Sequence, residues 1–176
     1  MKIKELNRIA MTTALIAVCA WINIPGPVPY TLQTFAVCMA AGLLGSKKSA
    51  VSALVYIVIG AIGLPVFSGG RSGIGTLLGE TGGYIVGFLP MVWILGKVYE
   101  KSGKKSTLVH IGGLVLSLCL CYLCGILWSV VVYMSKEAMV GAYIIAAKYV
   151  LPFVIPDILK LLLADFMVKA LKKRGI

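Results

Sequence analysis

An acidic and a basic residue near the carboxyl end of the chain have the spacing of a polar ligand site. Asp157 and Lys160 follow Pro156 on the first turn of an apolar segment and lie three residues apart. On a helix this spacing puts both side chains on one face. An ionisable pair inside a membrane helix is costly, and by default it marks the path or site of a ligand or ion. The competing interpretation is a mutual salt bridge that caps the helix, with Asp157 favoured by the helix dipole.

A glycine-rich stretch, Gly63–Tyr84, is the second candidate for a binding element. It contains eight glycines in 22 residues, together with the charges of Arg71 and Glu80. Glycine at this density permits tight turns and close approach to a ligand, and it weakens helices and strands. Apolar residues are distributed along the stretch, which argues against a solvated linker. We interpret it as a packed loop that lines a cavity, with an apolar hinge between two helices as the alternative.

Side chains suited to catalysis or metal binding are scarce. His110 is the single histidine, and we expect it at the protein surface. Cys119, Cys121 and Cys124 form a C-x-C-x-x-C pattern inside an apolar run with no histidine nearby, which is more typical of small buried hydrophobes than of a metal site. No nucleophile elbow or phosphate-binding G-x-x-x-x-G-K-[ST] pattern is present. We therefore expect no enzyme activity, no metal ion and no cofactor.

The composition is that of an integral membrane protein. The chain of 176 residues is 60% hydrophobic and only 13% charged, and its mean hydropathy is +0.98. Soluble domains are near half apolar and a quarter charged. The net charge of +11 does not indicate nucleic-acid binding, because the basic residues form short clusters at the ends of apolar runs. We expect one all-α membrane domain over residues 1–176.

Apolar runs separated by proline, glycine and charged clusters predict six transmembrane helices. The expected helices are Leu6–Ile24, Tyr30–Leu44, Ser49–Ile62, Gly83–Val98, Thr107–Tyr133 and Phe153–Leu171. The glycine-rich loop then connects helices 3 and 4.

Two of these segments and the stretch before the last one are less regular. Helices 2 and 3 are short for a bilayer, but one re-entrant hairpin would leave Lys47 and Lys48 inside the membrane, so two short or tilted spans are favoured. Met134–Leu151 mixes charged and apolar residues and predicts a short interfacial helix before helix 6. Asp165 and Lys169, four residues apart on helix 6, are expected to form a surface or intrahelical pair.

The distribution of basic residues predicts the orientation in the membrane. With six spans and a cytoplasmic amino terminus, 13 of the 17 lysines and arginines lie on the cytoplasmic side. This distribution satisfies the positive-inside rule. Both termini are then cytoplasmic, and the glycine-rich loop and the start of helix 6 share the extracellular side.

Small residues on the first helix offer a surface for a partner helix. Ala10 and Ala14, continued by Ala17 and Ala20, form a strip at spacings of three and four residues. Such strips let a second helix approach closely. Packing within the chain explains the alanines equally well, so both interpretations stay open.

Four motifs, in order along nearly the whole chain, resemble the BioY family, the biotin-binding S-components of energy-coupling factor (ECF) transporters. They are T-L-Q-T-F at Thr31–Phe35, G-L-P-V-F-S-G-G at Gly63–Gly70, G-E-T-G-G-Y at Gly79–Tyr84, and P-D-x-x-K at Pro156–Lys160. The chain departs from the family at Glu80, where the family usually has proline.

The resemblance implies a six-helix protein in the plasma membrane of a prokaryote, with both termini in the cytoplasm. It implies a biotin pocket that faces outward under its loops, and a complex with a transmembrane coupling protein and two ATPases that drive uptake. Ala10 and Ala14 match the family's contact with the coupling protein.

With biotin as the ligand that the resemblance implies, its chemistry suggests roles for individual residues. Asp157 can accept hydrogen bonds from the ureido N–H groups of biotin while Lys160 donates to the ureido oxygen. Arg71, or backbone N–H groups around Gly82 and Gly83, would bind the valerate carboxylate. The reversed orientation, with Lys160 on the carboxylate, stays open.

The remaining contacts expected for the ligand are aromatic or neutral. They are Phe67, Tyr84 and Tyr30 beside the thioether ring, with Gln33 as a further polar contact. Two other functions are compatible with the sequence: an S-component for another small vitamin, and an oligomeric facilitator that needs no energy source. A membrane-embedded enzyme is the weakest alternative, because no reactive constellation is visible.

Overall fold

The protein is almost entirely helical. The computed structural model describes residues 3–24, 30–101, 107–135, 144 and 150–174. Its elements are α1 (Ile3–Trp21), β1 (Asn23–Ile24), β2 (Tyr30–Thr31), α2 (Gln33–Ala61), the 3-10 helix η1 (Ser68–Gly70), α3 (Ile74–Leu77), α4 (Gly82–Lys101), α5 (Thr107–Ser135) and α7 (Leu151–Lys173). The interfacial helix expected over Met134–Leu151 falls largely outside the described residues.

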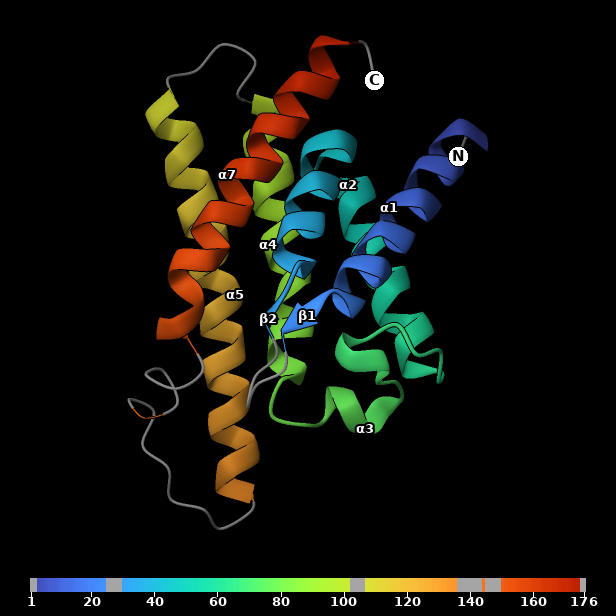
Figure 1. The fold of residues 1–176 in the computed structure, drawn as a ribbon, viewed down its shortest axis with the longest axis vertical. Coiled ribbons are helices and arrows are strands. Elements are labelled where there is room, and N and C mark those ends of the chain that lie inside the picture. The colour runs from blue at the N-terminus through green and yellow to red at the C-terminus, as the bar shows by residue number, and fades with distance from the viewer. Residues whose placement is uncertain (1–2, 25–29, 102–106, 136–143, 145–149, 175–176) are drawn as a thin grey trace.

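Three of the described helices are long and apolar enough to cross a membrane. These are Gln33–Ala61, Gly82–Lys101 and His110–Tyr133, the last being most of α5. Their length and composition agree with the expected all-α membrane protein. The two termini lie at one end of the molecule, and α3 lies toward the other end (Figure 1).

Helix α2 is broken at Gly45, and its two halves run in opposite directions (Figure 1). Gly45 has φ 74° and ψ −179°, a conformation that L-residues with a side chain rarely adopt. The expected polar turn over residues 45–48 is therefore shorter, because helix resumes at Ser46. Helix α4 (Gly82–Lys101) packs closely against this break at Gly96. A Cβ added to Gly96 would lie 2.3 Å from backbone atoms of Ser46, so only glycine permits this contact.

A carboxylate caps the second half of α2. Glu100 Oε1 accepts hydrogen bonds from the Ser46 backbone N–H at 2.7 Å and from Ser46 Oγ at 3.0 Å. An acceptor at this position satisfies a backbone donor that a helix start leaves unpaired, and its negative charge is favourable there.

We expect Glu100→Ala to destabilise the protein by roughly 1–2 kcal/mol, because the second half of α2 loses its cap. The measurement is the unfolding midpoint in detergent. Glu5→Ala is the matched control, since the Glu5 carboxylate forms a partly exposed 2.6 Å ion pair with Lys48. Exposed ion pairs contribute about 0–1 kcal/mol, so the control should lose less. Equal losses would contradict the capping role.

Some helices begin or end at residues that differ from the sequence prediction. Helix α1 ends at Trp21 and not at Ile24, and Tyr30 belongs to β2, which pairs antiparallel with β1. This hairpin brings the start of α2 back beside the end of α1. Helix α7 begins at Leu151, two residues before the expected start. Proline is tolerated in a first turn, so Pro152 does not delay the helix.

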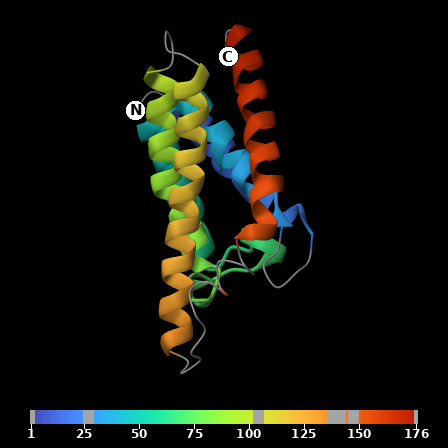
Figure 2. The ribbon, with the colours of Figure 1, turned by 90° about the vertical axis from the view of Figure 1, so that its left-hand side faces the viewer.

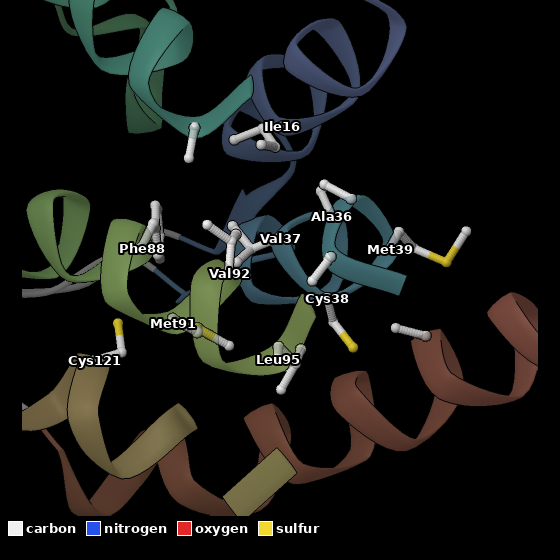
Figure 3. Close-up of a cluster of buried hydrophobic side chains, with 14 of the residues drawn as sticks. Ile16, Ala36, Val37, Cys38, Met39, Phe88, Met91, Val92, Leu95 and Cys121 are labelled. Atoms are coloured by element: carbon white, nitrogen blue, oxygen red, sulfur yellow. The ribbon is translucent and has the colours of Figure 1, made fainter. Parts of the chain in front are cut away.

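The core lies where α2 meets its neighbours. Helix α2 packs against α1, α4 and α7, and α4 packs against α5. Apolar side chains from these helices form a buried cluster, shown in Figure 3, in which Ile16, Val37, Met91 and Leu95 have no exposed surface. Figure 2 shows α7 beside this group, with its first turn toward the end where the glycine-rich segment lies.

Candidate ligand-binding site

A cavity of about 650 Å³, which includes some open solvent, lies where the ends of several helices meet the glycine-rich segment. Its polar lining comes from Thr31, Gln33, Thr34, Ser68, Thr81, Tyr84, Tyr122, Asp157 and Lys160. Its apolar lining comes from Ile85, Phe88, Cys121 and Phe153. The glycine-rich segment and α7 thus share one cavity, as the sequence predicts.

Asp157 is the most heavily bonded group in the cavity. It is only 4% exposed. Its Oδ1 accepts hydrogen bonds from Thr34 Oγ1 at 2.9 Å and from Lys160 Nζ at 2.7 Å, and its Oδ2 accepts one from the Tyr122 hydroxyl at 2.7 Å. Because α7 starts at Leu151, Asp157 lies in its second turn and not in the first. The mutual salt bridge is therefore present, but it does not cap the helix.

The remaining hydrogen-bonding capacity of the pair can be counted. A carboxylate offers about four acceptor positions, and an ammonium offers three donors. Asp157 uses three acceptor positions, and Lys160 uses two donors, on Asp157 and on the Thr31 carbonyl at 2.7 Å. The pair thus retains one acceptor on Oδ2 and one donor on Nζ, with its two charges compensating each other. Such a pair is suited to a neutral group that both donates and accepts.

Two further polar side chains at the cavity differ in how well they are satisfied. Gln33 Nε2 donates to the Tyr56 hydroxyl at 2.7 Å, and Gln33 Oε1 accepts from Thr31 Oγ1 at 2.9 Å. This network fixes the orientation of the Gln33 amide. Ser68 Oγ is buried and has no hydrogen-bond partner among the described residues. A buried hydroxyl without a partner is costly, so Ser68 Oγ is a position where a ligand atom can bind.

The three aromatic residues expected at the ligand occupy different positions. Tyr84 lines the cavity, and a Cβ on Gly125 would lie 2.3 Å from its ring, so this glycine makes room for the ring. Tyr30 is outside the lining and stacks on the lining residue Phe153, with ring centroids 4.1 Å apart. Phe67 is fully buried and outside the lining, edge-on to Tyr56.

Of the groups expected to bind a carboxylate, Arg71 and Gly82 do not line the cavity in this structure. Arg71 is exposed and outside the lining. Its backbone carbonyl accepts the Phe67 N–H at 3.0 Å. The Gly82 N–H is already engaged, since it donates to the Gly79 carbonyl at 3.1 Å, and a Cβ on Gly82 would meet the Leu77 carbonyl. Glycine at position 82 therefore allows the tight turn that leads into α4.

Several lining residues were missed by the sequence reasoning. Thr34 and Tyr122 bind Asp157 from 123 and 35 residues away in the chain, and spacing within a sequence gives no signal for such contacts. Thr34, Ser68 and Thr81 do lie inside quoted motifs, and the rarity of polar side chains in apolar surroundings is the signal that could have identified them.

A second polar cluster lies outside the cavity and corrects two expectations. His110 is 5% exposed and not on the surface, because its Nε2 is 2.5 Å from Asp165 Oδ1. The Tyr99 hydroxyl donates to the same oxygen at 2.9 Å, and Lys169 pairs with Oδ2 at 2.6 Å. The Asp165–Lys169 intrahelical pair is confirmed, but its carboxylate is buried. Of the C-x-C-x-x-C cysteines, Cys121 is buried as expected, whereas Cys119 is exposed.

The alanine strip of α1 divides into two parts. Ala10 and Ala14 are exposed, whereas Ala20 is fully buried. Packing within the chain therefore accounts for Ala20 and does not account for the other two.

An apolar helical chain with a part-polar cavity between its helices is a membrane-embedded protein built to hold a small ligand. Comparison with known families agrees with this class, since residues 1–175 match the family model described as the BioY family. The chain belongs to the BioY family.

Individual relatives and a solved structure are similar over most of their lengths. The biotin transporter BioY of Thermotoga maritima is 36% identical over 172 residues, which cover 97% of this chain and 96% of that protein. The probable biotin transporter BioY of Pyrococcus horikoshii is 40% identical over 162 residues, or 91% of each chain. The crystal structure of the S-component for biotin from an ECF-type ABC transporter has a TM-score of 0.81 at 28% identity, and the match covers 97% of this chain and 92% of that one.

Proposed function

We propose that this protein binds biotin and mediates its uptake as the S-component of an ECF transporter. The observation that carries the proposal is the compensated Asp157–Lys160 pair inside a cavity lined by polar and aromatic side chains. Relatives named as biotin transporters, similar over nearly their whole length, supply the identity of the ligand.

The ureido ring is the part of biotin that we assign to the charged pair. A cyclic urea is neutral, donates through N–H and accepts through its oxygen, and these requirements match the remaining acceptor on Asp157 Oδ2 and the remaining donor on Lys160. Placing the valerate carboxylate there would add a negative charge beside Asp157, which is unfavourable for a buried group. The hydrogen-bond count therefore supports the ureido orientation over the reversed one.

The rest of the ligand extends toward the glycine-rich segment. Tyr84, together with Phe153 and the Tyr30 ring stacked behind it, would flank the thioether ring. Arg71 would reach the valerate carboxylate by turning its exposed side chain toward the cavity mouth, since a guanidinium binds carboxylates in a bidentate manner. Gln33 and Ser68 supply further polar contacts.

We also propose six membrane spans: α1, the two halves of α2 on either side of Gly45, α4, α5 and α7. An even number of spans agrees with termini at one end of the molecule (Figure 1). The excess of lysine and arginine near that end supports cytoplasmic termini and a cavity that opens to the outside. A coupling protein would then contact α1 at Ala10 and Ala14, and ATPases would supply the energy that this chain's own residues show no means of providing.

Calorimetry of the purified protein with biotin and with a panel of other vitamins tests the proposed ligand. Binding of biotin alone, at one molecule per chain, is the expected result. Tighter binding of another vitamin would contradict it. Biotin uptake into vesicles that lack any ATPase would favour a facilitator over an S-component.

Ser68→Ala should weaken biotin binding by about two- to tenfold, the value of one hydrogen bond to a neutral group. Ser72→Ala is the matched control, because Ser72 is outside the cavity lining and its contact with Thr76 is made by its backbone carbonyl. Titration calorimetry on both variants provides the comparison. Unchanged affinity in Ser68→Ala would show that the buried hydroxyl does not contact the ligand.

A further inference from the structure

Three hydrogen bonds fasten the glycine-rich segment to the end of α5 that is far from the termini. The Trp128 indole N–H donates to the Gly79 carbonyl at 3.1 Å, and Ser129 Oγ donates to the Glu80 carbonyl at 2.8 Å. The Tyr133 hydroxyl donates to Glu80 Oε2 at 2.9 Å. We call these three contacts the α5 clasp. All of its donors come from two turns of one helix, and all of its acceptors belong to two adjacent residues.

The α5 clasp connects two walls of the ligand cavity. On the loop side, Thr81 directly follows Glu80 and lines the cavity, as does Tyr84. On the helix side, α5 contributes Cys121 and Tyr122. A ligand that leaves between these walls must separate the loop from α5, which breaks the clasp. The strength of the clasp therefore bears on how long the ligand stays bound.

The contact between Tyr133 and Glu80 is the strongest member of the clasp. A hydrogen bond to a carboxylate contributes more than one between neutral groups, because the acceptor is charged. Both residues are partly buried, so water competes less well for this bond than it does at a fully exposed site. It is also the member that depends on the side chain of Glu80, since the other two use backbone carbonyls.

We propose that Glu80 and Tyr133 are positioning residues that set the residence time of the ligand by holding the loop closed against α5. The proposal deepens the proposed function and rests on it, because the ligand is the biotin assigned to this cavity. Neither residue lines the cavity, so both act through the neighbouring wall and not by touching the ligand.

The experiment compares three variants in which the clasp is altered at one bond. In Tyr133→Phe and Glu80→Met, the dissociation rate of labelled biotin should rise at least about tenfold, the lower end of the range for one hydrogen bond to a charged group. The association rate should change by less than about twofold, since mutations at one interface act mainly on dissociation. Glu80→Gln keeps a neutral oxygen that can accept from Tyr133, so its dissociation rate should lie between those of the unmodified protein and Glu80→Met.

A second readout separates loop closure from general stability and from ligand identity. Hydrogen exchange of the backbone amides over residues 74–82 should be faster in ligand-free Tyr133→Phe than in the unmodified protein, with exchange in α2 unchanged. Unmodified dissociation and exchange in Tyr133→Phe would overturn the proposal, as would a Glu80→Gln variant that behaves like Glu80→Met. Failure of the unmodified protein to bind biotin would overturn the proposed function, and the exchange measurement would still decide whether the clasp closes the loop.

Discussion

Asp157→Asn is expected to weaken biotin binding at least about 30-fold, which corresponds to about 2 kcal/mol. The carboxylate of Asp157 accepts hydrogen bonds from Thr34, Tyr122 and Lys160, and one of its acceptor positions remains unused. An asparagine has one oxygen in place of two and turns two N–H donors toward groups that also donate. The substitution also removes the negative charge that faces the ammonium of Lys160, whose side chain is only 15% exposed.

Titration calorimetry on the purified variant measures this effect, and Asp165→Asn is its matched control. Asp165 lies on the same helix and is also buried and ion-paired, but it is outside the cavity lining. Its substitution should lower the unfolding midpoint while changing the biotin affinity by no more than about twofold, because distant sites act independently. Equal losses of affinity in the two variants would assign the effect to the stability of α7 and not to the ligand site.

Ala14→Trp is expected to abolish biotin uptake and complex formation with the coupling protein while biotin affinity stays unchanged. Ala14 is exposed on α1, so a large side chain there extends from the surface of the described chain. A partner helix packed on small residues lies close to the backbone, and an indole would hold it several ångströms away.

Co-purification with the coupling protein and uptake into cells measure the two losses, and calorimetry measures the affinity. Ala170→Trp is the control, since Ala170 is an exposed alanine on a different helix, α7. We expect this control to retain uptake. A drop in biotin affinity in Ala14→Trp would contradict the partner role, because it would place that face of α1 inside the folded protein.

Much of the fold and the main feature of the site follow from local properties of the sequence. Hydropathy and charge clusters identify the long helices, because a helix that crosses a membrane needs an apolar run long enough to span the hydrocarbon core. The high cost of charges within such helices singles out Asp157 and Lys160. The density of glycine identifies Gly63–Tyr84 as a loop that approaches other elements closely. These three inferences meet in one cavity of the structure.

The features that the sequence could not provide depend on contacts between distant residues. His110 was expected at the surface because it lies near the cytoplasmic end of an expected helix. Asp165, which holds it in the interior, is 55 residues away in the chain. The turn at Gly45 is short because Gly96 and Glu100 of α4 contact Ser46 directly after it. The local sequence shows which residues are costly to bury. Which of them form hydrogen bonds or ion pairs depends on the tertiary structure.

The orientation of biotin in the cavity is the central claim, and a structure of the protein at saturating biotin tests it most directly. The account predicts the ureido oxygen within about 3.2 Å of Lys160 Nζ and a ureido N–H at the same distance from Asp157 Oδ2, with the valerate directed toward the glycine-rich segment. A valerate carboxylate bound to Lys160, or a cavity that stays empty under these conditions, would contradict it.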